Sequence, residues 1–414
     1  MFSTLVLGTL TDRQRHLHIK AHEKSVPLGT IPESALSLLH AYENAGNPAP
    51  MTAYSRIIAT LFRVSSSLAH AQAWDLFSHM RYVAHPEADA HLFTQMIRAC
   101  AFTTSAEPER ALDLFTEMTI DRGISPTASA YNAVILACAR SGSKAYVNEA
   151  FRLAKEMLDS HRDALGRGAF YPDSQTYIAL FEGAKRIGDL GRVRWILAGM
   201  VEASRKDSKI VVDERIMTHV FHSYAAYKPP FKRSMAPLAD QDKGDKDISG
   251  ASPTELVESS AVDQEPLAPS FAHLPPQSRS DVIREAMALF SRISGMSPLA
   301  FDSGFLPALP YVHVTQRLLN AYLSIFYTHA SLERAHELFR TVFAEHGLKK
   351  DALTLVEALE RCARARRGPE RLTVSGFAEE AWDEWTDLEN NSTTRVSARH
   401  IQRAYSARVR VLTL

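Results

Sequence analysis

The chain of 414 residues has few cysteines, no excess of either charge and no long apolar run. Cys100, Cys138 and Cys362 are odd in number and far apart, which excludes an even disulfide framework and favours a reducing compartment or an organelle matrix. The apolar runs are shorter than the roughly 20 residues of a membrane-spanning helix, so no transmembrane span is expected. The net charge of zero excludes a nucleic-acid binder that works by bulk charge, so any basic site must be local.

Motifs that mark common active sites are also missing. The chain contains no Gly-rich phosphate loop, no GxSxG elbow, no HExxH and no CxxC pair. His219 and His222 stand at helical spacing, but no third ligand lies near them in the sequence, so they are interpreted as packing or surface histidines. No catalytic residue, metal site, cofactor or small-molecule substrate is therefore expected, and the protein is not expected to be an enzyme.

What the sequence does contain is a repeated helical pattern. The string A-x-x-L-F-x-x-M, with variations, occurs six times. Its alanines are Ala73, Ala111, Ala150, Ala286, Ala335 and Ala381. Alanine lets two helices approach closely, and the Leu, Phe and Met positions fill the groove between neighbouring units. These positions are therefore predicted to form the core of an array of stacked units.

A second helical pattern precedes these copies and is marked by one anchor residue per unit. The anchors are Tyr54, Phe93, Tyr131, Tyr177, Met217, Thr315 and Leu355. Their separations are 39, 38, 46, 40, 98 and 40 residues, and the single outlier contains an insertion. A helical hairpin with one apolar face must stack on its neighbours. The predicted fold is all-α, a right-handed α-solenoid of about seven helical-hairpin repeats.

The same register accounts for the cysteines. Each of the three follows its anchor by seven residues, at a position that is small or apolar in the other repeats. The thiols are therefore predicted to be buried hydrophobic side chains, without a metal or redox role.

The predicted organisation has five parts. Residues 1–31 form an N-terminal segment, 32–227 helical repeats, 228–280 an insertion, 281–390 further repeats and 391–414 a basic C-terminal capping helix. The basic, acid-poor start fits a mitochondrial transit peptide or, alternatively, a first helix of the fold. Eight prolines and mixed charge predict that the insertion is a disordered loop, with a partner-binding or modification site as the alternative.

Several repeats open with a characteristic string. It reads TAYS at 52–55, SAYNAVI at 129–135 and QTYIAL at 175–180, and one repeat closes with GISP at 123–126. Over roughly residues 52–388 the chain resembles the pentatricopeptide repeat family, of fungal or organellar type with degenerate repeats. The tetratricopeptide signature fits worse. The resemblance implies an RNA-binding solenoid, usually organellar, whose repeats each hold one base with two or three side chains.

The resemblance also implies where bases are read, at the residue two after the anchor and at the last residue of the repeat. The polar residues at these positions are Arg56, Gln95, Ser174, His219 and Arg317. The family favours Thr, Ser or Asn at the first position and Asp, Asn or Ser at the second, and these types are almost absent here. A degenerate code of this kind points toward a scaffold on a ribosome or an RNA-processing complex.

Arginines recur nine residues after the anchor in four of the repeats. They are Arg63, Arg140, Arg186 and Arg364. The resemblance implies that a basic residue here meets the RNA backbone, and a stripe of guanidinium groups suits phosphates. The alternative is that each arginine occupies the solvated end of a first helix, where a cation favours the helix dipole.

A second basic region follows the last acidic residue of the chain. It comprises Arg395, Arg399, Arg403, Arg408 and Arg410. This patch is predicted to bind rRNA or an acidic partner. The alternative is that it forms the solvated face of a capping helix.

Two functions follow from these observations. The first is a non-catalytic RNA-binding repeat protein of the mitochondrial matrix that acts in mitochondrial RNA processing, stability or translation, with single-stranded mRNA or rRNA as its partner. The alternative is a protein-binding scaffold, for example of mitochondrial ribosome proteins, with little direct RNA contact.

Overall fold

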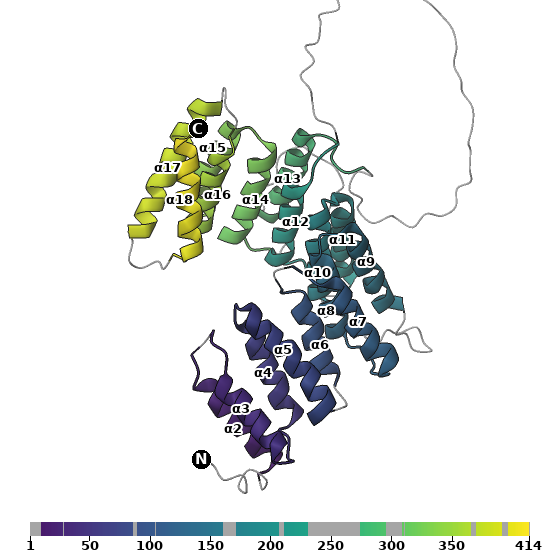
Figure 1. The fold of residues 1–414 in the computed structure, drawn as a ribbon. Helices are drawn as coiled ribbons and strands as arrows, with labels where there is room; N and C mark the ends of the chain where they lie inside the picture. Colours follow the sequence, from purple (N-terminus) through teal and green to yellow (C-terminus); the bar gives the residue numbers. More distant parts are fainter. Residues whose placement is uncertain are drawn as a thin grey trace, which may run out of the picture. The chain divides into compact units, whose positions relative to one another are not determined.

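The computed structural model describes residues 10–27, 29–85, 89–103, 105–159, 171–206, 211–230, 274–294, 309, 311–365, 370–390 and 396–413. Within these residues the regular elements are all helices (Figure 1). The predicted all-α class is confirmed. Among the described helices none has the length and apolar character needed to cross a membrane. The chain divides into two compact units, Met1–Gly183 and Ala184–Leu414, so that the boundary falls within helix α10 (Ser174–Ile187).

The first unit contains consecutive helical hairpins. They are α2 (Asp12–Lys24) with α3 (Glu33–Asn44), α4 (Met51–Arg63) with α5 (Ser67–His79), α6 (Ala90–Cys100) with α7 (Pro108–Thr116), and α8 (Ala128–Arg140) with α9 (Lys144–Asp159). Short π-helical turns, η1 (Met80–Ala84) and η2 (Glu117–Asp121), extend α5 and α7. The first helices contact one another in sequence order, α2 with α4, α4 with α6 and α6 with α8. Successive hairpins therefore stack as predicted.

The second unit continues the same order. Its helices are α11 (Leu190–Lys206), α12 (Glu214–Ala226), α13 (Arg279–Ser294), α14 (Gln316–His329), α15 (Leu332–Glu345), α16 (Ala352–Ala363), α17 (Glu370–Asn390) and α18 (Ala398–Leu412). Helix α12 contacts α14, α14 contacts α16, and α16 contacts α18, so that α18 takes the place of a further first helix. Within the predicted C-terminal segment 391–414, the described helix is α18, Ala398–Leu412.

Several first helices share one way of starting. The side chains of Asp89, Thr127, Asp213 and Asp351 each accept a hydrogen bond from a backbone N–H three residues later, which satisfies a donor that the helix leaves unpaired. Each of these capping residues lies four positions before an anchor. Thr315 is also such a cap, of α14.

The spacing predicted that Thr315 is the anchor of its repeat. Because Thr315 is the cap of α14, it is not the anchor. The residue four positions on is Leu319, which is fully buried in α14. The prediction was wrong because the insertion breaks the count of residues, and a Thr followed seven positions later by Tyr322 imitates the pattern. Seven positions after the true anchor stands Phe326, which is also buried.

The core follows the repeat register closely. All six predicted second-helix alanines have no exposed surface. The three cysteines are likewise fully buried, and burial raises the pKa of each thiol to about 12, which makes them inert hydrophobic side chains as predicted. In α11 the alanine position is taken by the buried Val193, so this helix escaped the sequence pattern.

The N-terminal segment and the end of the insertion both contain described structure. In the N-terminal segment 1–31, helix α2 packs into the array through Arg15 and Ile19, while residues 1–9 lie outside the described part. The insertion predicted over 228–280 ends in residues that are held in place. Arg194 Nη1 donates to the Leu274 carbonyl at 2.9 Å, and the Tyr227 hydroxyl donates to the Pro276 carbonyl at 3.0 Å. The prediction of a loop up to residue 280 is corrected there, and residues 231–273 lie outside the described part.

Candidate nucleic-acid interface

A basic cleft lies between α16 and α18 near the end of the chain. Helix α18 packs through Ala404 and Ala407, both buried. Its residues 399, 403, 406 and 410 recur at the spacing of one helical face. The small alanines let α18 approach α16 closely, and the face beside them carries the arginines into the cleft.

The cleft has a volume of about 390 Å³ and is strongly positive. Its lining includes four guanidinium groups and one carboxylate, those of Arg364, Arg399, Arg403, Arg410 and Glu360. The sequence had placed Arg364 in a repeat stripe and the other three arginines in a separate C-terminal patch. The fold brings both predictions together in one site with a surplus of three positive charges.

One arginine of the cleft is neutralised within it. Arg403 binds Glu360 with two hydrogen bonds, of 2.8 Å from Nε and 3.1 Å from Nη2. These bonds lower the pKa of Glu360 and raise that of Arg403. Arg364 lies 3.7 Å from the same carboxylate, with 76% of its side chain exposed. Arg399 and Arg410 are exposed. Three guanidinium groups therefore face solvent, where they can take a phosphate by paired charge-assisted hydrogen bonds.

The two remaining arginines of the predicted C-terminal patch do not line the cleft. Arg408 is half-buried and lies over the ring of Trp382 in α17, 5.4 Å from its centroid. Arg395 lies outside the described residues. Arg408 is thus part of the packing that holds α18 on α17.

The other three arginines of the predicted stripe occupy helix ends. Arg63 closes α4 and is exposed, Arg140 closes α8, and Arg186 is the exposed penultimate residue of α10. Arg140 donates to the Ala101 carbonyl at 3.1 Å and covers the ring of Phe102 at 4.4 Å. Its guanidinium connects α8 to the end of α6. This position fits the helix-end interpretation, since a cation is favoured there.

Two of the predicted base-facing residues are engaged in helix contacts. Arg56 forms an ion pair with Glu23 of α2, and Gln95 donates from Nε2 to the Ser55 carbonyl at 2.9 Å. At the equivalent position of the next repeats, Ala133 and Ala179 are buried. The residue two after the anchor therefore packs between successive first helices in these repeats.

The other base-facing candidates are scattered along the register. Ser174 is the half-buried first residue of α10, and His219 is half-buried in α12. Arg317, two residues after the misplaced anchor Thr315, is exposed in the first turn of α14. These three candidates lie on three different first helices, α10, α12 and α14.

A polar network that the sequence reading missed lies one residue after the anchor. Asn132 donates from Nδ2 to Oδ1 of Asp173 at 2.9 Å, and Thr176 donates to Asn132 Oδ1 at 2.5 Å. Asp173 in turn caps α10 by accepting from the Thr176 backbone N–H at 3.0 Å. An amide and a carboxylate side by side offer a donor and acceptors, as the edge of a base requires.

The same network recurs in the second unit with the corrected anchor. Asn320 donates to Asp351 Oδ1 at 3.1 Å and accepts from the Thr354 hydroxyl at 2.7 Å. Asn320 is only 3% exposed, whereas Asn132 is half-buried. Both networks could have been found by pairing the residue after each anchor with the helix cap that precedes the next anchor.

No family model matches the chain. Over 131 residues the chain is 30% identical to the mitochondrial 15S rRNA processing factor CCM1 of Yarrowia lipolytica, which covers 31% of this chain and 15% of that protein. The crystal structure of the pentatricopeptide repeat protein PPR10 from maize aligns with 97% of the chain at 16% identity and a TM-score of 0.39. A structure of PPR10 with an 18-nt psaJ RNA element aligns at 14% identity and a TM-score of 0.33.

The chain spans about half the length of these solved proteins, 52% and 51%. Its helical hairpins, and the strings that open them, resemble those of pentatricopeptide repeats.

Proposed function

We propose that this protein is a non-catalytic, single-stranded RNA-binding repeat protein of the mitochondrion that acts in mitochondrial RNA processing, stability or translation. The observation that carries the proposal is the basic cleft between α16 and α18. Three of its guanidinium groups are exposed, and the single carboxylate there is occupied by Arg403. Such a site concentrates positive charge in a protein whose net charge is zero, which is what local recognition of a phosphate backbone requires.

The similarity to a mitochondrial rRNA processing factor supports the proposed location in the mitochondrion and the proposed role in RNA processing. The similar stretch covers 31% of this chain and 15% of that factor. The half-buried Asn132–Asp173 pair is the best site for contact with a base, because it combines an amide with a capping carboxylate at a repeat-defined position. Its partner network at Asn320 is buried and serves the packing of α14 on α16.

The test is the binding of a labelled, mixed-sequence single-stranded RNA to the full chain at several salt concentrations. A variant with Arg364, Arg399 and Arg410 changed to alanine removes the three exposed guanidinium groups. We expect an affinity loss of about 100-fold at low salt, and a salt slope smaller by about two, because each contact with a single strand contributes about 0.7.

The matched control changes three exposed arginines outside the cleft, Arg110, Arg152 and Arg340, to alanine. Both variants lower the net charge by the same amount, so only a loss confined to the cleft variant supports the proposal. Equal losses of RNA affinity in the two variants would mean that the total charge of the protein determines binding, and that the cleft has no specific role. Crosslinking and sequencing of bound RNA distinguishes the alternative, because a protein-binding scaffold would recover protein partners without any enriched transcript.

A further inference from the structure

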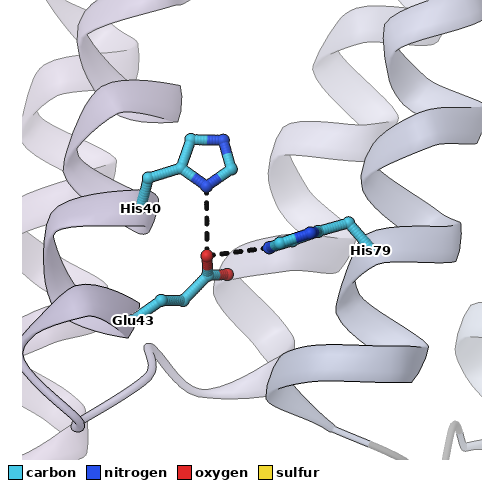
Figure 2. Close-up of side chains that lie close together, drawn as sticks. All are labelled: His40, Glu43 and His79. Atoms are coloured by element: carbon cyan, nitrogen blue, oxygen red, sulfur yellow. Dashed lines mark hydrogen bonds and ion pairs between the residues drawn. The ribbon is translucent and has the colours of Figure 1, made fainter.

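A cluster of two histidines and one glutamate joins the N-terminal hairpin to the first repeat (Figure 2). His40 and Glu43 are three residues apart on α3, which places them on one face of the helix, and His79 is the last residue of α5. His40 Nδ1 lies 3.0 Å, and His79 Nε2 lies 2.8 Å, from the same carboxylate oxygen, Oε2 of Glu43. The three potential ligand atoms all lie within 4.8 Å of one another.

The glutamate is held in the orientation that this cluster needs. The Tyr54 hydroxyl, from the anchor of α4, donates to Oε1 of Glu43 and so leaves Oε2 to face the two imidazole rings. Tyr54 thereby fixes Glu43 as a preoriented oxygen ligand, in the way that a second partner fixes metal ligands in proteins.

We propose that His40, Glu43 and His79 bind one divalent transition-metal ion, of which Zn²⁺ is the best match. Two imidazole nitrogens and one carboxylate are a donor set that zinc takes, with bond lengths of about 2.0–2.2 Å. Tetrahedral ligands at that bond length lie about 3.3 Å apart, close to the two separations from Glu43. Each imidazole would shift its proton to the other ring nitrogen. The ion would replace the two hydrogen bonds, and water would complete its coordination on the exposed side of His40.

The ordinary alternative is that two histidines simply donate to a buried carboxylate. Two observations favour the metal. Both rings direct a nitrogen at the same oxygen of Glu43, while Tyr54 donates to the other oxygen and holds the carboxylate in place. The site also bridges elements that differ in origin, because α3 belongs to the hairpin before the first repeat and α5 to the repeat itself. A bound ion would clamp this hairpin onto the array.

The experiment is a calorimetric titration of the full chain with Zn²⁺, for the unchanged protein and the variants His40→Ala and His79→Ala. The control is His91→Ala, which removes an exposed histidine of α6 outside the cluster. The unchanged protein and the control should bind one ion at least about tenfold more tightly than either cluster variant.

A thermal melt of each protein accompanies the titration, since a cluster variant that unfolds would also lose the ion. His40 has 52% of its side chain exposed, so His40→Ala is expected to melt like the unchanged protein without zinc and to lose only the shift that zinc produces. Titration curves of His40→Ala and His79→Ala that superimpose on that of the unchanged protein would overturn the proposal. So would the absence of any zinc-induced shift in the unchanged protein.

Discussion

The first and last helices of the array carry their charges in opposite ways. In the N-terminal region, α2 to α4, Arg15 pairs with Asp12, and Arg56 pairs with Glu23, whose side chain is only 9% exposed. In the C-terminal region, α16 to α18, four arginines surround the single Glu360. Both regions pack one additional element against the repeats, yet only in the second do four arginines gather around one carboxylate.

This contrast separates two uses of charge that the overall balance hides. The Arg56–Glu23 ion pair holds α2 on the repeats, so these charges stabilise the fold and are not available to a ligand. The surplus at α16 and α18 is not needed for packing, because Ala404 and Ala407 provide the contact. A change in the N-terminal region should therefore cost stability, and a change in the C-terminal cleft should cost binding.

The largest expected effect on stability comes from Arg56→Ala. The substitution leaves Glu23 buried with only the Thr60 hydroxyl as a donor, at 2.6 Å. Breaking a buried ion pair by removing one partner should destabilise the packing of α2 by about 3 kcal/mol. Hydrogen exchange of the α2 amides measures this local loss of stability. A local measurement is needed because each repeat of an array contacts only its neighbours.

The control for this prediction is Arg340→Ala, which removes an exposed partner of Glu380 and should leave exchange unchanged. RNA affinity should be equal in both variants. Because the pentatricopeptide resemblance had placed Arg56 at a base-reading position, a selective loss of RNA binding by Arg56→Ala would show that the ion pair opens to meet RNA.

The sequence predicted the parts of the fold that depend on local periodicity. The buried alanines, the inert cysteines and the helical hairpins follow from a period that each repeat expresses by itself. The anchor of α14 was misplaced because the insertion interrupts that period, and α11 was missed because Val193 replaces the alanine.

The cleft could not be predicted as one site for a different reason. The packing of α18 on α16 brings Arg364 together with Arg399, Arg403 and Arg410. This packing is a tertiary contact, and so is the pairing of Arg403 with Glu360. Sequence spacing can place arginines on the face of a helix, but it does not show which of them meets an acid from another helix.

A smaller effect is expected from Glu357→Gln, which tests whether the basic region also contains an unpaired acid. Burial raises the pKa of Glu357 from 4.5 to about 7, while Arg403 is committed to Glu360. The folded state then keeps a proton that the unfolded chain has lost. The resulting stability is present below the ordinary pKa and disappears as the pH rises through about 7.

Glu357→Gln should remove this pH dependence and stabilise the protein at about pH 8 by about 2 kcal/mol. Chemical denaturation at several pH values measures the change. The exposed Glu345→Gln on α15 serves as the control and should leave the pH profile of the unchanged protein in place. A profile that is the same for Glu357→Gln would mean that the cleft arginines keep this carboxyl ionised.

The smallest effect distinguishes the two sides of α18. Arg408 lies over Trp382 at 5.4 Å, and Trp382 meets Tyr405 edge-on at 5.1 Å, whereas Arg410 lines the cleft. Arg408→Ala should lower the stability of α18 on α17 by about 0.5–1 kcal/mol, the value of a partly exposed cation–π contact. It should leave RNA affinity unchanged, while Arg410→Ala should weaken RNA binding and leave the denaturation midpoint in place. Both variants remove one arginine from the same helix, so each serves as the control for the other. Equal losses of RNA affinity would mean that RNA binding depends on the total charge of α18, and not on whether an arginine lines the cleft.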